Sequence, residues 1–143
     1  MAARIGSAKW QGTLKEGEGT VTIGQGGLSA PYTFDSRFGE GTAGANPEEL
    51  IAAAHAACFS MALNNALHLH EHGPVSIETT ARAHIRQIDE KPTIAKIELE
   101  CVGDVPGIDE AHFIEHAEEV KENCIISRAL SVPEIELTAR LAN

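Results

Sequence analysis

The chain has 143 residues, of which 43% are hydrophobic and 22% charged, a composition typical of globular proteins. It predicts a single domain over residues 1–143 and excludes the disordered, collagen-like and disulfide-framework classes. The chain carries 11 Lys and Arg residues against 21 Asp and Glu residues, a formal net charge of −10. This charge argues against nucleic acid and anionic membrane as partners, because both require a positive field.

The first 40 residues are rich in glycine and predict a meander of short strands at residues 8–11, 20–23 and 32–34. Residues 37–45, which contain three glycines, predict a loop. Residues 1–12 contain no apolar stretch of the kind found in a signal peptide. We therefore expect a cytoplasmic protein.

A long helix is predicted next. Asn46 is a good N-cap, Pro47 suits the first helical position, and the pattern continues to about His72 before Gly73 and Pro74 stop it. Residues 50–63 are apolar or small on nearly every face, which predicts a buried central helix. The nearly apolar run at 51–59 is too short to span a bilayer.

The second half alternates strands and helices. Residues 75–88 and a following strand that ends near residue 101 alternate apolar and polar side chains, which predicts a hairpin with a turn at 89–92 and one solvated face. A helix is expected from about Asp109, a short helical piece at 127–130 and a last strand at 134–141. This order of elements predicts an α+β fold.

The chain has three cysteines, and an odd number in a reducing compartment does not favour structural disulfides. Cys101 alternates with apolar residues on the buried face of a strand and is predicted to be structural. Cys58 and Cys124 each lie on an apolar helical stripe, where they either pack in the core or act as reactive thiols. Residues 48–68 contain no Lys or Arg, so a cation that activates Cys58 must come from elsewhere in the fold or from another chain.

Two of the histidine pairs have metal-ligand spacing on a helix: His68 with His72, and His112 with His116. Neither pair has an evident third ligand, and polar helix faces near water explain both. His55 lies within the apolar helix and is interpreted as a hydrogen-bonded core histidine.

The run Asn46-Pro47-Glu48-Glu49-Leu50-Ile51-Ala52-Ala53-Ala54-His55-Ala56-Ala57-Cys58-Phe59-Ser60-Met61-Ala62-Leu63 carries a family resemblance. It resembles the OsmC branch of the OsmC/Ohr family, bacterial thiol peroxidases that reduce organic hydroperoxides. Shorter matching segments before the run, before the second helix and in the last strand extend the resemblance over the whole chain.

The resemblance implies a fold and a set of site residues. The fold is an intertwined α+β homodimer, with the long central helix wrapped by antiparallel sheets and active sites at the interface. Cys58 matches the peroxidatic cysteine, Cys124 the resolving cysteine, Arg37 the active-site arginine and Glu48 its glutamate. One departure is Ile125, where family members often have a proline after the second cysteine.

The implied reaction is the reduction of an organic hydroperoxide to an alcohol, through a Cys58 sulfenic acid and a Cys58–Cys124 disulfide. A dithiol, possibly a lipoylated protein, restores the thiols, and no cofactor is implied. Two other interpretations stay open: a non-catalytic redox sensor or binding protein on the same scaffold, and a metal-binding protein that uses the histidine pairs.

Glu48 and Cys58 are ten residues apart on one predicted helix. They are therefore roughly 15 Å apart along its axis and about 80° apart around it. No Gly or Pro at 50–57 breaks the helix. If both residues serve one site, we expect Cys58 and Cys124 from one chain and Arg37 and Glu48 from its partner.

Overall fold

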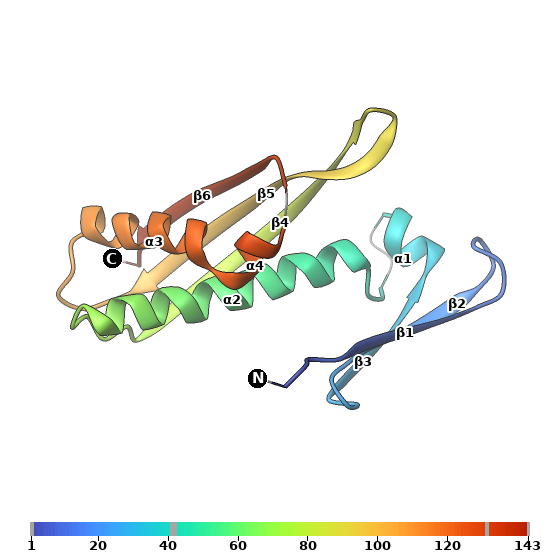
Figure 1. Cartoon of the computed structure of the whole chain (residues 1–143), viewed down its shortest axis with the longest axis horizontal. Coiled ribbons are helices and arrows are strands. Elements are labelled where there is room, and N and C mark those ends of the chain that lie inside the picture. Colours follow the sequence, from blue (N-terminus) through green and yellow to red (C-terminus); the bar gives the residue numbers. More distant parts are fainter. Residues whose placement is uncertain (1, 41–42, 131, 143) are drawn as a thin grey trace. The chain divides into compact units, whose positions relative to one another are not determined.

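The structure is a computed structural model that describes residues 2–40, 43–130 and 132–142. The chain forms two compact units, residues 1–50 and residues 51–143. The elements are shown in Figure 1. Their mixture of strands and helices confirms the α+β class, while the single-domain expectation stays a prediction.

The first unit contains an antiparallel meander. Strands β1 (Gly6–Gln11), β2 (Glu18–Ile23) and β3 (Leu28–Thr33) pair in the order β1-β2-β3. This confirms the three predicted strands, with longer bounds.

A short helix, α1 (Phe34–Phe38), follows β3 directly, so the predicted strand at residue 34 and the loop at 37–38 are wrong. The cause is a capping box: the Thr33 side chain accepts a hydrogen bond from the Ser36 backbone, and the Ser36 hydroxyl accepts one from Thr33 N–H. This turn fixes where the Arg37 side chain begins.

Helix α2 (Pro47–Leu69) is continuous over 23 residues. It ends three residues before the predicted His72, where Glu71 adopts a positive φ of 64° and His72 N–H donates to the Leu67 carbonyl. In length and composition α2 also resembles a membrane-spanning helix, as the core helices of soluble proteins do.

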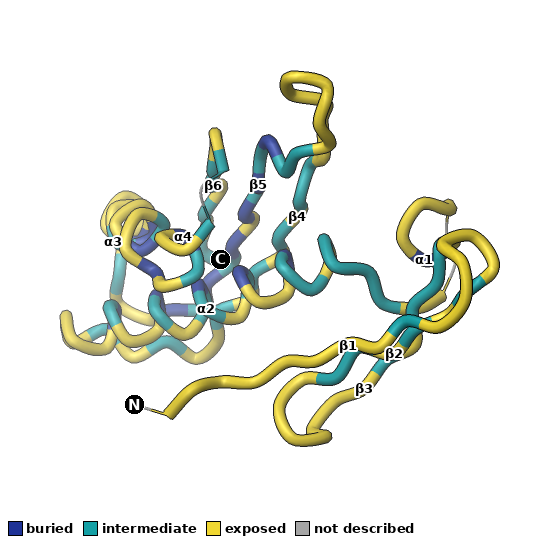
Figure 2. The backbone as a smooth tube through the Cα atoms, turned by 45° about the vertical axis from the view of Figure 1, so that its right-hand side comes forward, coloured by how far each residue is buried: buried dark blue, intermediate teal, exposed yellow. Residues whose placement is uncertain are grey.

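One stripe of α2 is buried in the chain: Ala52, His55, Phe59, Leu63 and Leu67. Its other side is small or apolar but exposed, and Met61 there is 76% exposed. Figure 2 shows this mixture of buried and exposed residues along α2. The predicted burial on nearly every face is therefore not met within one chain.

The second unit has a three-stranded sheet in the order β4-β5-β6, made of β4 (Ser76–Ile88), β5 (Lys91–Asp104) and β6 (Glu134–Leu141). The predicted hairpin is confirmed, but its turn is only Asp89 and Glu90, both with positive φ, and β5 begins at Lys91. Strand β6 pairs with β5 in parallel, which differs from the expected antiparallel sheet.

The parallel pairing follows from the connection between the two strands. Helices α3 (Glu110–Asn123) and α4 (Ile125–Ala129) lie between β5 and β6 in the chain. They return the chain toward the end of the sheet where β5 begins, so β6 runs in the same direction as β5. Helix α3 begins beside Asp109, as predicted, and Asp109 is its N-cap, since its carboxylate accepts a hydrogen bond from His112 N–H.

The core of this unit lies between the sheet and helices α2 and α3. The buried stripe of α3 consists of Phe113, Ala117 and Val120. It packs in one cluster with the inner face of β5 and the buried stripe of α2. The fully buried members of the cluster are Phe59, Leu63, Leu67, Ile97, Leu99, Cys101, Phe113 and Ala117.

Candidate active site

Arg37 and Glu48 form a two-pronged ion pair in the first unit. Arg37 Nη2 donates to Glu48 Oε1 over 2.6 Å, and Arg37 Nε donates to the same carboxylate over 3.2 Å and 3.3 Å. Helix α1 supplies the arginine and the first turn of α2 supplies the glutamate. Such fork-to-carboxylate contacts fix the plane of the guanidinium as well as its position.

The Glu48 carboxylate is held in its charged form. Its partial burial opposes the charge, but the hydrogen bonds and the positive charge of Arg37 outweigh that effect, so the pKa of Glu48 lies below its ordinary value. The Glu48 side chain is 16% exposed and that of Arg37 is 42% exposed. The pair therefore stays charged at neutral pH and presents its arginine toward solvent.

Arg37 lies in the wall of a cavity of about 380 Å³ within the first unit. The other lining residues are mostly aromatic or apolar: Trp10, Gly12, Leu14, Tyr32, Thr33, Phe34, Phe38 and Pro47. The guanidinium carbon also lies 5.1 Å from the centre of the Phe38 ring. This arrangement places one cation beside an apolar hollow, which suits a ligand with a polar head and a hydrocarbon body.

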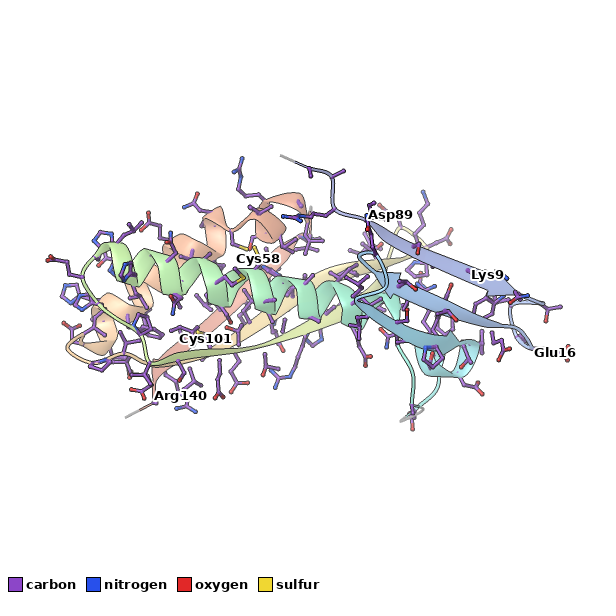
Figure 3. The ribbon with its side chains drawn as sticks, turned by 90° about the horizontal axis from the view of Figure 1, so that it is seen from below. Lys9, Glu16, Cys58, Asp89, Cys101 and Arg140 are labelled. Carbon is purple, nitrogen blue, oxygen red and sulfur yellow. The ribbon has the colours of Figure 1, made fainter. Side chains whose placement is uncertain are left out.

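Cys58 lies on α2 in the second unit, as Figure 3 shows. Its thiol is free and half-buried, and it packs against the core cluster that contains Cys124. A thiol at such a boundary is accessible enough to meet a substrate from solvent.

Cys124 lies between α3 and α4. It is 4% exposed, its N–H closes α3 on the Val120 carbonyl, and its own backbone is extended. Its sulfur caps α4 by accepting a hydrogen bond from Ser127 N–H over 3.4 Å. Helix α3 thus ends at Cys124, although residue 125 is an isoleucine rather than a proline.

Two further polar side chains join Cys124 in the core. The Ser127 hydroxyl lies 3.3 Å from the Cys124 sulfur and 2.7 Å from His55 Nε2. His55 is fully buried, and burial lowers its pKa. This confirms the interpretation of His55 as a hydrogen-bonded core histidine, while its link to Cys124 was not foreseen. The sequence contains no cue for the link, because 72 residues separate His55 from Ser127.

Cys101 is fully buried on β5 between apolar neighbours, as predicted. Burial raises the pKa of the Cys101 thiol, and a weaker hydrogen bond with Thr79 opposes that effect. Cys101 therefore stays protonated at neutral pH, and its structural role stays a prediction.

The histidine pairs do not form a metal centre in the part of the chain that the structure describes, where no three His, Cys, Asp or Glu side chains converge. Exposed His112 instead contacts the Asp109 carboxylate. His116 stacks on His70, with ring centres 4.6 Å apart.

The structure thus joins Arg37 to Glu48 in the first unit and places Cys58 and Cys124 against one core cluster in the second. Sequence reasoning missed Ser127 and the role of His55 beside Cys124.

Comparison with known proteins identifies relatives. A family described as OsmC-like protein matches residues 39–139. Peroxiredoxin OsmC of Escherichia coli (strain K12) is 47% identical over 139 residues, which cover 95% of this chain and 94% of that protein. A protein of the same name from Shigella flexneri has the same identity and coverage.

Two solved structures are also similar to this chain. An organic hydroperoxide resistance protein from Elizabethkingia anophelis is 28% identical with a TM-score of 0.66, covering 99% of this chain and 98% of its own. An OsmC-like protein from Vibrio cholerae shares the fold at 15% identity, with a TM-score of 0.78 over 97% of this chain and 99% of its own. With a family match over most of its length and a relative that matches nearly all of it, the chain belongs to the OsmC-like family.

Proposed function

We propose that this protein reduces organic hydroperoxides to alcohols, with Cys58 as the peroxidatic thiol and Cys124 as the resolving thiol. Its 47% identity to Peroxiredoxin OsmC over 95% of the chain makes it a thiol peroxidase. The observation that supports the organic substrate is the Arg37 guanidinium, fixed by Glu48 in the wall of a largely apolar cavity. A hydrocarbon chain fits such a hollow, whereas hydrogen peroxide gains nothing from it.

In the first chemical step the Cys58 thiolate attacks the nearer peroxide oxygen. An S–O bond forms, the O–O bond breaks, and the alkoxide leaves as an alcohol after taking up a proton. Arg37 stabilises both the thiolate and the charge that develops on the oxygens. Glu48 uses the Nε and Nη2 edge of the guanidinium, and among the described residues no side chain hydrogen-bonds to Nη1, which stays available to the peroxide.

In the second step the Cys124 sulfur attacks the Cys58 sulfenic acid. A disulfide forms and water leaves. A dithiol, for example a lipoyl group, then reduces the disulfide by exchange. The cycle begins with the Cys58 and Cys124 thiols reduced. We expect the protein to act in the cytoplasm, where such thiols stay reduced.

We further propose that the active site is completed in a homodimer. Helix α2 is continuous from Pro47 to Leu69, so Glu48 and Cys58 lie roughly 15 Å apart along one helix axis. One carboxylate cannot orient an arginine beside that sulfur on the same chain across this distance. The small, exposed side of α2, with Ala53, Ala57 and Met61, offers a surface that a second copy can cover. Cys58 and Cys124 then meet Arg37 and Glu48 of the other chain.

The substrate class is tested by comparing kcat/KM for cumene hydroperoxide and hydrogen peroxide, with dihydrolipoamide as reductant. The apolar cavity predicts a preference of about 10²-fold or more for cumene hydroperoxide, since burial of a phenyl-sized group contributes roughly 2–3 kcal/mol. Equal values for the two peroxides would exclude the organic substrate. Oxidation that stops after one equivalent of peroxide, with dithiol present, would instead indicate a redox sensor.

Replacing Cys124 with serine should permit one oxidation of Cys58 but prevent disulfide formation. We expect a stoichiometric burst of peroxide consumption followed by turnover about 10²-fold slower than in the unmodified protein. Dimedone trapping with mass spectrometry detects the sulfenic acid that accumulates on Cys58. If the Cys124→Ser variant recycles at the original rate, Cys124 is not the resolving thiol.

A further inference from the structure

A chain of three polar side chains crosses the otherwise apolar core of the second unit. His55 is fully buried on α2, Ser127 is 7% exposed on α4, and Cys124 is 4% exposed at the start of α4. Hydrogen-bond distances of 2.7 Å and 3.3 Å connect His55 Nε2 to Ser127 Oγ and Ser127 Oγ to the Cys124 sulfur. Burying such groups costs free energy unless they are paired, so their pairing here is a built feature of the core.

The direction of these hydrogen bonds follows from His55. No described residue hydrogen-bonds to its Nδ1, and a buried N–H without an acceptor is rarer than an acceptor without a donor. The proton therefore lies on Nε2, which donates to Ser127 Oγ. The Ser127 hydroxyl in turn donates to the Cys124 sulfur, which also accepts the Ser127 N–H. The sulfur receives two donors.

We infer that His55 and Ser127 are positioning residues that prepare Cys124 as a thiolate for disulfide formation, an inference that rests on the proposed resolving role of Cys124. Two donors aimed at one sulfur favour its anion over the neutral thiol. Burial of His55 keeps its imidazole neutral, so His55 and Ser127 act on Cys124 through hydrogen bonds rather than through a full positive charge. His55 and Ser127 act before the Cys124 sulfur attacks, and neither side chain touches the peroxide substrate.

The step that they prepare is balanced. The Cys124 thiolate attacks the sulfur of the Cys58 sulfenic acid, the S–S bond forms and the S–O bond breaks. The leaving hydroxide combines with the proton that Cys124 released, which gives water. The hydroperoxide has already supplied the oxidising equivalents, so no other oxidant is needed.

The first test titrates Cys124 alone, in protein that carries Cys58→Ser and Cys101→Ser, by thiolate absorbance at 240 nm. We expect Ser127→Ala and His55→Leu each to raise the titration midpoint, by about one pH unit for Ser127→Ala. His55→Gln, whose amide can donate in place of Nε2, should move it less. The matched control is Ser60→Ala, which removes another partly buried hydroxyl, one bonded to Thr79.

Other titratable groups also face Cys124. His70 and Glu119 line a cavity of about 290 Å³ that the Cys124 side chain also lines. Among the described residues only Ser127 hydrogen-bonds to the Cys124 sulfur, so the inference predicts that His70→Gln and Glu119→Gln leave the midpoint nearly unchanged. A midpoint unmoved by Ser127→Ala, or moved as far by Glu119→Gln, would overturn the inference. This titration does not depend on peroxidase activity, so it separates the inference from the proposed function.

The second test follows disulfide formation after one equivalent of cumene hydroperoxide, by rapid quench and mass spectrometry between pH 6 and pH 9.5. In Ser127→Ala the Cys58 sulfenic acid should form at the original rate, while the disulfide forms about tenfold more slowly at pH 7. The deficit should shrink as pH rises past the ordinary thiol value of about 8.5. A deficit of equal size at every pH would indicate displacement of Cys124 alone, and would contradict the inference.

Discussion

Cys58→Ser protein should lose peroxide reduction by about 10³-fold or more, the scale expected when a nucleophile is removed. Serine is nearly isosteric with cysteine, and Cys58 is half-buried at the edge of the core, so we expect the fold to survive. The measurement is cumene hydroperoxide consumption with dihydrolipoamide as reductant, together with circular dichroism to verify folding.

Cys101→Ser is the matched control for this variant. It also replaces a thiol by a hydroxyl, but at a fully buried site on β5, and should leave turnover nearly intact at some cost in stability. A folded Cys58→Ser protein with near-normal turnover would exclude Cys58 as the nucleophile. A folded but inactive Cys101→Ser protein would contradict the structural role of Cys101.

Arg37→Ala should lower kcat/KM for cumene hydroperoxide by about 10²–10³-fold, the range for losing one donor to a developing negative charge. The reason is the fixed guanidinium: two of its nitrogens are bound by Glu48, so the group is held in place before substrate arrives. The alkylation of Cys58 by iodoacetamide at pH 7 should slow in the same variant, because less thiolate is present.

Arg82→Ala is the control for the loss of an arginine. Arg82 also pairs with a carboxylate, that of Glu100 at 3.2 Å, but on the exposed face of the second unit's sheet. This variant should keep full activity, since exposed pairs contribute little to stability. Unchanged turnover and unchanged alkylation of Cys58 in Arg37→Ala would remove Arg37 from the active site.

Local patterns in the sequence were sufficient to predict most elements. The bounds of β6 follow from strict alternation, and the start of α3 follows from the Asp109 cap. Helix α1 was missed because its capping box uses Ser36 at the third position, where Glu or Gln is the usual residue. The sequence alone does not reveal this pairing, because the pairing depends on the conformation of the turn.

Features that depend on contacts between residues far apart in the sequence could not be predicted from local patterns. The parallel register of β6 on β5 depends on how α3 and α4 pack, which no local pattern specifies. The contact between His55 and Ser127 joins two elements that are far apart in sequence. The apolar composition of α2 predicted burial on nearly every face, but one side is exposed in the single chain. Composition shows that a face is apolar and does not show which molecule covers it.

The candidate site likewise has one part that the sequence could predict and one part that it could not. The resemblance of the helix segment around Cys58 to the family selected Arg37 and Glu48, and the structure places these two side chains in direct contact. Neither the sequence of one chain nor its fold contains the partner copy, so the assembly of the four residues is a proposal that must be tested with two chains.

The decisive measurement mixes Cys58→Ser and Arg37→Ala subunits, each inactive alone, under conditions of subunit exchange. If Cys58 and Cys124 of one chain work with Arg37 and Glu48 of the other, each heterodimer contains one intact site and one doubly damaged site. Turnover per heterodimer should then recover to about half that of the unmodified dimer. Native mass spectrometry counts the heterodimers in the same sample. No recovery of turnover in a sample with proven heterodimers would show that each chain builds its own site, and would contradict this account.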